Sequence, residues 1–369
     1  MQYISSEKLH PGVRIVKPIY SKDGVLLCNA NSQLSNLSIR NIQQSASEGI
    51  YVYELNEPIM YIPEEDIAFE QAQTVYLYQI KDLYEKIYKQ ESWDTLDHLV
   101  AEFHKHYGKK TTHRINYNQN LRTSNDFMYK HAISVAVLST LMGQYIQLSA
   151  DDYKSLIAAS LLYGFGHRFL VKKDRTNNTT TLEFDEATLQ SALEKGVIYL
   201  NATTPQIPYL QKAVHIAEHY IFSKNPERSK EHSSEEVLLL SEILKTAIEF
   251  DWLTGLMINE KPKSELLAIN NLLERPAEFN KTIVSVLVHS IHIVPVGANV
   301  ILNTGDKATV LVVNEKNYKQ PIILHLKEDK IYNLNDPAVH QHIQIVDIIK
   351  TMDNRIELNP NTEEYLKNL

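Results

Sequence analysis

The stretch LIAASLLYGFGHRF, residues 156–169, decides how the chain is interpreted. Its first seven residues are apolar or small, which is typical of a buried helix, and the glycines that follow predict that the helix ends there. Tyr163 and Gly164 stand at that end, and His167 follows three residues later. Side chains that come after the last turn of a buried helix lie at the edge of the core, where functional residues often gather. The possible chemistry of this turn depends on which other side chains of the chain lie beside it.

The composition is that of an ordinary globular protein with more than one folding unit. The chain has 369 residues, of which 43% are apolar and 22% are charged, and its formal net charge is -8. This charge gives no broad basic field, so a nucleic-acid polymer is not an expected partner. Cys28 is the only cysteine, and no apolar run reaches the length of a membrane span. We expect a cytoplasmic protein without disulfide bonds or membrane insertion.

The residue pattern predicts a mainly α protein with β elements at both ends. A hairpin signal opens the chain, apolar residues at helical spacing fill its middle, and four strand-like runs follow Pro295. The predicted parts are an α+β module (1–63), a helical connector with a linker (64–125), a helical core (126–293) and a β-rich segment with a tail (294–369).

The predicted connector has an aromatic face that includes Tyr76, Tyr84 and Tyr88. Such a face is typical of core packing, and it is also a candidate surface for a partner protein. After the connector, the polar and aperiodic segment 108–126 predicts a linker or loop.

Fifteen histidines raise the question of a metal site. The segment HIAEH, residues 215–219, matches the inverted zincin pattern, in which two histidines one helical turn apart bind zinc and Glu218 is the general base. An amphipathic helix with one histidine at its surface explains the same five residues. The segment HSIH, residues 289–292, predicts two histidines on one face of an apolar helix, where core or interface packing is the expected role.

The order of these parts resembles that of bacterial HD-GYP proteins, phosphodiesterases that hydrolyse cyclic di-GMP at a centre of two or three irons. Residues 9–54 look like the N-terminal module often found in the family. Residues 294–324, VPVGANVILNTGDKATVLVVNEKNYKQPIIL, are similar to its C-terminal segment. The resemblance implies an HD-type helical core between them, in which the first metal histidine of the family falls on His131.

Other positions of the family's metal site carry residues that do not bind metal well. The defining His-Asp pair falls on Tyr163-Gly164, and the lysine that follows it falls on His167. The GYP motif is missing from residues 223–230. The remaining replacements are Ala192 and Ile248 for a metal histidine and a metal aspartate, and Tyr220 for the histidine that would follow His219.

The missing His-Asp pair predicts that hydrolysis is lost, because a bridging carboxylate is needed to hold the metals that activate the attacking hydroxide. We therefore expect a noncatalytic regulatory protein in bacterial cyclic di-GMP signalling, acting as a nucleotide sensor or as a protein-interaction scaffold. No catalytic residue and no cofactor are expected. The candidate residues of a ligand pocket are Lys130, His131, Tyr163, His167, Arg168 and His219.

Two alternatives remain at the level of the sequence. One is a pure scaffold that forms a homodimer and binds a signalling or motility protein. The other is residual phosphodiesterase activity with iron or manganese at a changed histidine site, for which His131 and His219 are the candidate metal ligands. His167 and His215 would complete that site.

Overall fold

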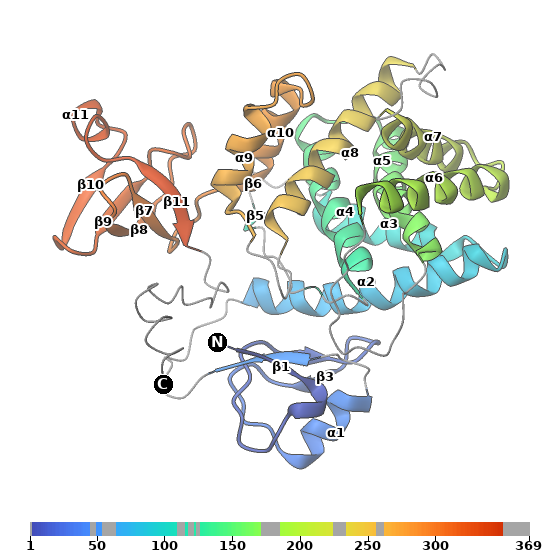
Figure 1. Ribbon diagram of the computed structural model, residues 1–369, viewed down its shortest axis with the longest axis horizontal. Coiled ribbons are helices and arrows are strands. Elements are labelled where there is room, and N and C mark those ends of the chain that lie inside the picture. Colours follow the sequence, from blue (N-terminus) through green and yellow to red (C-terminus); the bar gives the residue numbers. More distant parts are fainter. Residues whose placement is uncertain are drawn as a thin grey trace.

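The structure is a computed structural model of the chain. Its described residues are mainly helical, with short strands at both ends (Figure 1). This confirms the mainly α prediction. None of the helices among these residues has the length and apolar character needed to cross a bilayer. The structure describes residues 2–44, 49–53, 64–108, 115–116, 122, 126–170, 185–223, 234–255 and 262–349.

The N-terminal module has its own hydrophobic cluster, which includes Ile15, Ile42 and Val52. Strands β2 and β3 form the predicted hairpin, and Gly24 supplies the positive φ of 78° that its turn requires. Strands β1 and β4 pair antiparallel beside it. The elements are β1 (Gln2–Ser5), a 3-10 turn η1 (Ser6–Lys8), β2 (Ile19–Tyr20), β3 (Leu26–Cys28), α1 (Asn36–Gln44) and β4 (Gly49–Val52).

The predicted connector consists of two helices, α2 (Glu64–Tyr88) and α3 (Asp94–Tyr107). The chain reverses between them, where Gln90 adopts a φ of 58°. Tyr76 and Tyr84 on the predicted aromatic face are buried in the same hydrophobic cluster as the helices that follow. The connector therefore contributes directly to the core.

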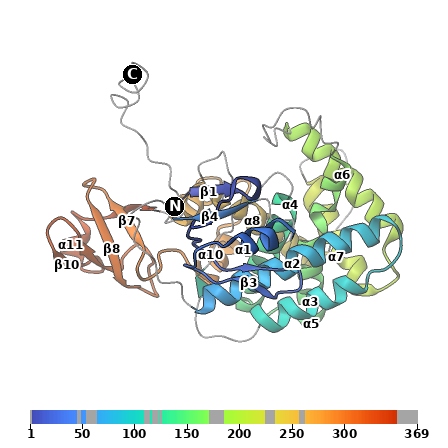
Figure 2. The same ribbon diagram turned by 90° about the horizontal axis from the view of Figure 1, so that it is seen from below.

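The module lies against the N-terminal half of α2, below that helix in Figure 1 and in front of it in Figure 2. Lys17 forms an ion pair with Glu70, and the side-chain amide of Gln71 donates a hydrogen bond of 2.7 Å to the carbonyl of Gly24. A single long helix thus joins the module to the helical core.

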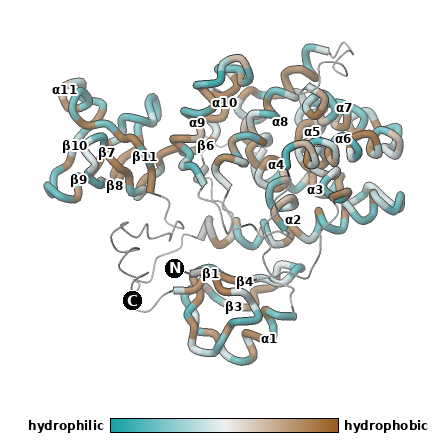
Figure 3. Tube along the Cα trace, in the orientation of Figure 1, coloured by the Kyte–Doolittle hydropathy of each residue, from teal (hydrophilic) through white to brown (hydrophobic). Residues whose placement is uncertain are grey.

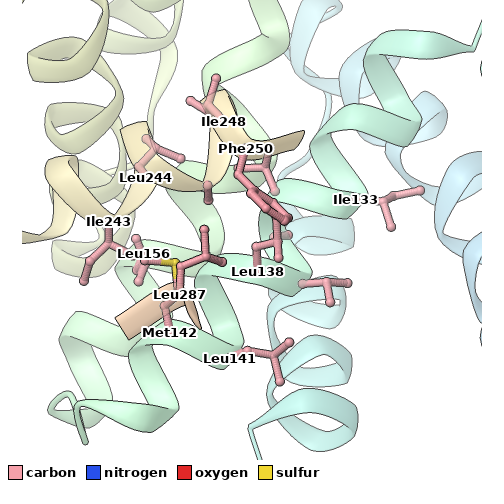
Figure 4. Packing of buried hydrophobic residues seen from close by; sticks show 14 of the residues in the cluster. Ile133, Leu138, Leu141, Met142, Leu156, Ile243, Leu244, Ile248, Phe250 and Leu287 are labelled. Atoms are coloured by element: carbon pink, nitrogen blue, oxygen red, sulfur yellow. The ribbon is translucent and has the colours of Figure 1, made fainter. Parts of the chain in front are cut away.

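The helical core packs apolar faces of several helices around α4. In Figure 3, hydrophobic residues run along α5 and α8 in its centre. Figure 4 shows Leu138 of α4, Leu156 of α5 and Leu287 of α10 within this cluster. The helices are α4 (Phe127–Tyr145), α5 (Ala150–Leu162), α6 (Glu186–Thr203), α7 (Pro208–Phe222), α8 (Glu235–Thr254), α9 (Glu265–Leu273) and α10 (Lys281–Ser290).

The C-terminal segment folds into an antiparallel sheet in the order β10-β9-β8-β7-β11. The four predicted runs become four of its strands, and the fifth, β10, was missed because its sequence KIYN is short and half polar. Its elements are β7 (Asn299–Leu302), β8 (Lys307–Val312), β9 (Ile322–His325), β10 (Lys330–Asn333), α11 (Pro337–His340) and β11 (Ile345–Ile349). The predicted tail, 350–369, lies outside the described residues.

Two predictions about local structure are wrong. Helix α10 ends at Ser290, and Ile291–His292 form strand β6, so His289 and His292 do not share a helix face. Strand β6 pairs in parallel with β5 (Ile115–Asn116), which lies inside the segment predicted as a linker. In the same segment, Arg122 is among the largest fully buried side chains, with 2% of its surface exposed. The described part of this linker is therefore built into the core.

Residues 156–169 form the second half of α5 and then the 3-10 turn η2 (Tyr163–Phe169). Two glycines allow the backbone of η2 to lie directly against the backbone of α6. A Cβ at Gly166 would lie 2.2 Å from the carbonyl oxygen of Ala192, and a Cβ at Gly196 would lie 2.3 Å from the Cα of Gly166. Real Cβ atoms do not come this close to backbone, so these two glycines set the position of η2.

The substitution Gly196→Ala is expected to destabilise the protein by about 3 kcal/mol, because the added methyl forces η2 away from α6. The neighbouring exposed residue Lys195 provides a control, since Lys195→Ala should change the unfolding free energy by less than about 0.5 kcal/mol. Chemical denaturation followed by far-UV circular dichroism measures both. Equal stability of the two variants would contradict the close packing.

Candidate functional site

The core holds a buried ionic network that joins three separate parts of the chain. Asp251 on α8 has no exposed surface, and its Oδ1 accepts a hydrogen bond of 2.6 Å from Nη2 of Arg122. Its Oδ2 accepts a short hydrogen bond from Nδ1 of His131 on α4, which is 1% exposed. Arg122 also contacts the hydroxyl of Ser134 at 3.4 Å. Both carboxylate oxygens are therefore engaged.

The charges of this network offset one another. Burial by itself would raise the pKa of Asp251, but Arg122 and His131 hold it well below its usual range, so the carboxylate stays ionised. Burial lowers the pKa of His131 against the attraction of Asp251, which would raise it. A neutral His131 that donates from Nδ1 leaves a lone pair on Nε2. The resulting network has one cation and one anion.

Turn η2 brings Tyr163 and His167 to the same region. The ring of Tyr163 meets that of His131 edge to face, with centroids 5.8 Å apart. Nδ1 of His167 donates a hydrogen bond of 2.7 Å to the carbonyl of Gly164, which leaves the Nε2 of this imidazole as a second acceptor. Burial raises the pKa of Tyr163 well above its usual value, so its phenol stays neutral.

Three polar atoms of these residues are buried without a hydrogen-bond partner among the described residues: Nε2 of His131, Nε2 of His167 and the hydroxyl of Tyr163. Buried polar groups in proteins are almost always hydrogen-bonded, so unpaired ones mark places where water or a ligand binds.

Aromatic side chains lie between the ionic network and solvent. Trp252 stacks obliquely on His131 with centroids 4.7 Å apart, and 38% of its surface is exposed. Phe127 contacts both Trp252 and His167, at 5.5 Å and 5.6 Å between centroids. Trp252 is therefore the side chain that separates His131 from solvent on this side.

The two cationic candidates have acidic partners. Lys130 pairs with Asp126 one helical turn earlier, at 2.7 Å. Arg168 pairs with Glu85 of α2 at 2.8 Å and lies over the ring of Tyr88. These contacts offset both charges locally, so neither side chain presents a bare positive charge to a phosphate group.

His219 lies in different surroundings from His131. Burial lowers the pKa of His219, and its titratable neighbours are His215, Glu242 and Lys245. Glu242 precedes Asp251 by nine residues on α8, a separation of about 13 Å along a helix axis. In the described part of the chain, no three histidine, cysteine or acidic side chains form a group that could hold a metal ion.

The resemblance assigns the later metal aspartate to Ile248, which belongs to the apolar cluster of the core (Figure 4). The acidic residue that meets His131 is Asp251, three residues later on α8. Tyr220, which stands where the resemblance implies a histidine, contacts Tyr163 with ring centroids 5.9 Å apart. The segment 224–230, where the GYP motif is missing, lies outside the described residues.

The side chains present do not fit an iron centre of the HD-GYP kind. A metal at this place would need the oxygens of Asp251 as ligands, but Oδ1 is bound by Arg122 and Oδ2 by His131. A guanidinium already placed on the carboxylate also repels a second cation. The resemblance places the bridging aspartate on Gly164, which has no side chain to bind a metal.

The sequence carries a signal for the burial of Asp251. Leu244, Ala247, Asp251 and Thr254 recur at helical spacing and are all buried, so an acidic residue on this apolar face requires a partner. Arg122 carried no such signal. It is a single cation in a polar, aperiodic segment, and only the tertiary structure shows that it enters the core.

Comparison of the chain with protein-family models, with curated proteins and with solved structures gives no match. The resemblance to HD-GYP proteins therefore stays a prediction from the sequence.

The buried imidazole of His167 should make the protein sensitive to acid. Burial lowers its pKa to about 4, against the hydrogen bond to Gly164, which raises it. The unfolded chain takes up a proton near pH 6.5 and the folded protein only near pH 4, so stability is complete above pH 6.5 and falls as the pH drops. From pH 7 to pH 5 this histidine should cost about 2 kcal/mol of unfolding free energy.

The variant His167→Asn keeps a donor for Gly164 and does not titrate. Its loss of stability between pH 7 and pH 5 should be smaller than that of the wild type by the same 2 kcal/mol or so. Urea denaturation at the two pH values measures this. Equal acid sensitivity of both proteins would show that His167 is accessible to protons in the folded state.

Proposed function

We propose that this chain is a noncatalytic regulatory protein of bacterial cyclic di-GMP signalling, with a degenerate HD-type helical core that acts through protein contacts. The observation that carries the proposal is the Arg122–Asp251 ion pair, because it neutralises the carboxylate that a metal-dependent hydrolase would need for its metal. The signalling context comes from the sequence resemblance alone.

The surroundings of the site favour a scaffold over a nucleotide sensor. Lys130 and Arg168 are paired with acids, and His131 and His167 have lowered pKa values, so these four residues offer little positive charge to a phosphodiester. Cytoplasmic location is part of the same proposal.

Helix α2 offers a physical route for regulation through contacts. Near one end, Glu70 and Gln71 hold the N-terminal module. Toward the other end, the hydroxyl of Tyr84 donates a hydrogen bond of 2.8 Å to the carbonyl of Leu161, and Glu85 pairs with Arg168 of η2. A partner bound to the module, or a second copy of the chain, would therefore act on an element that also contacts the buried site.

The purified protein, prepared without chelators, is expected to contain less than about 0.1 equivalent of iron or manganese and to leave cyclic di-GMP intact when either metal is added. Elemental analysis and chromatography of the nucleotide measure these two quantities, with an active HD-GYP phosphodiesterase as the positive control. Stoichiometric metal together with turnover would support the alternative of a residual phosphodiesterase with a changed histidine site.

Titration calorimetry with cyclic di-GMP separates the two regulatory forms. No heat at 100 μM nucleotide is the expected result for a scaffold, whereas saturable binding without cleavage would identify a sensor.

A further inference from the structure

The carboxylate of Asp251 loses its hydration in the core, and other groups must offset this loss. An ionised carboxylate without exposed surface is unstable unless a cation and hydrogen-bond donors offset its lost hydration. Proteins meet this need with a bound metal ion or with a buried basic side chain. Here Arg122 supplies the positive charge, and it comes from a segment outside the helices of the core.

Gly255 shows that the core is shaped around the guanidinium. Its φ of -62° and ψ of 132° are open to any residue, so its backbone does not require glycine. A Cβ at this position would lie 2.8 Å from Nη1 of Arg122, 2.9 Å from the backbone oxygen of Asp251 and 3.1 Å from Cζ of Arg122. The missing side chain leaves the space that the head of Arg122 fills.

We propose that Arg122 is a tethered cation that permanently occupies a cation-binding site formed by Asp251, His131 and Ser134, so that removing its side chain opens this site to a free guanidinium ion. Asp251 and Ser134 both accept from Nη2, so the site offers a carboxylate and a hydroxyl to one nitrogen of the cation. The inference concerns the same site as the proposed function and deepens it, since the guanidinium of Arg122 neutralises the carboxylate that a metal ion would need as a ligand.

The central test is chemical rescue of Arg122→Ala. Loss of the arginine leaves a buried, uncompensated anion, so the midpoint of thermal unfolding should fall by about 10 °C. Guanidinium chloride at 10 mM should restore at least a third of this loss in a saturable manner. Urea at 10 mM has the same shape without the charge and should restore nothing.

Matched variants locate the effect. Arg275 is a half-exposed arginine that pairs with Glu249 on the same helix α8, and Arg275→Ala should not respond to guanidinium. The double variant Arg122→Ala/Asp251→Asn removes the anion and should lose the rescue. Equal effects of guanidinium and urea, or equal rescue of Arg275→Ala, would overturn the proposal.

Fluorescence provides a local reading at the site. Trp252 lies over His131, and the chain contains only one other tryptophan, Trp93, so a Trp93→Phe background isolates its signal. In this background, guanidinium should change the emission of the Arg122→Ala variant and leave that of the wild type unchanged. Identical responses of the two proteins would count against binding beside Trp252.

The variant Gly255→Ala provides a second test if Arg122→Ala does not fold. This variant keeps every charge of the network and crowds both the guanidinium and the backbone carbonyl of Asp251, so it should shift Trp252 emission and lower the unfolding midpoint by several degrees. If Arg122→Ala is recovered in folded form only with guanidinium, the proposal is supported. If neither guanidinium recovers that variant nor Gly255→Ala perturbs the protein, the proposal is wrong.

Because none of these measurements involves a nucleotide or a partner protein, their failure would leave the proposed regulatory function standing. In the same way, turnover of cyclic di-GMP would overturn that function whatever the rescue experiments show.

Discussion

The carboxylate of Asp251 is held in the dry core of the helical part, where an ionised group is tolerated only if its charge is offset. Arg122 supplies the opposite charge and His131 donates a hydrogen bond. These two residues come from the segment before α4 and from α4 itself, while Asp251 belongs to α8. Parts of the chain up to 129 residues apart must therefore meet at one point. This requirement ties the segment before α4 to the core more strictly than apolar packing alone would.

The aromatic residues around the network follow from the same constraint. An ion pair in a low-dielectric site is strong only while water stays out. The rings of Trp252 and Tyr163 lie against His131, and Phe127 packs on Trp252. Turn η2 completes the enclosure, because the close approach of Gly166 and Gly196 holds Tyr163 and His167 in place. Nε2 of His131, Nε2 of His167 and the hydroxyl of Tyr163 are buried there without a hydrogen-bond partner among the described residues, and the Arg122–Asp251 ion pair makes the enclosure a poor site for a metal ion.

Local structure was predictable wherever neighbouring residues decide it. Ser149 caps α5 by accepting a hydrogen bond from the backbone of Asp152, and the hairpin turns at Gly24, because both features depend on a few consecutive residues. The strands β5 and β6 were missed because each has two residues and exists only through its pairing with the other. The helix end at Ser290 was missed for the same reason, since the apolar run continues past it without a stop signal.

The sequence by itself determined that this chain is mainly helical, that β elements lie at both ends and that Tyr163 and Gly164 follow a buried helix, because apolar periodicity and glycine positions are local properties. The sequence also indicated His131 and His167 as candidate residues of a ligand pocket. Only the tertiary structure decided which charges meet. Arg122 and Asp251 are far apart in the sequence, and they pair because the fold brings them together. A polar segment with one arginine is predicted as a loop, and only the folded core shows the anion that this arginine neutralises.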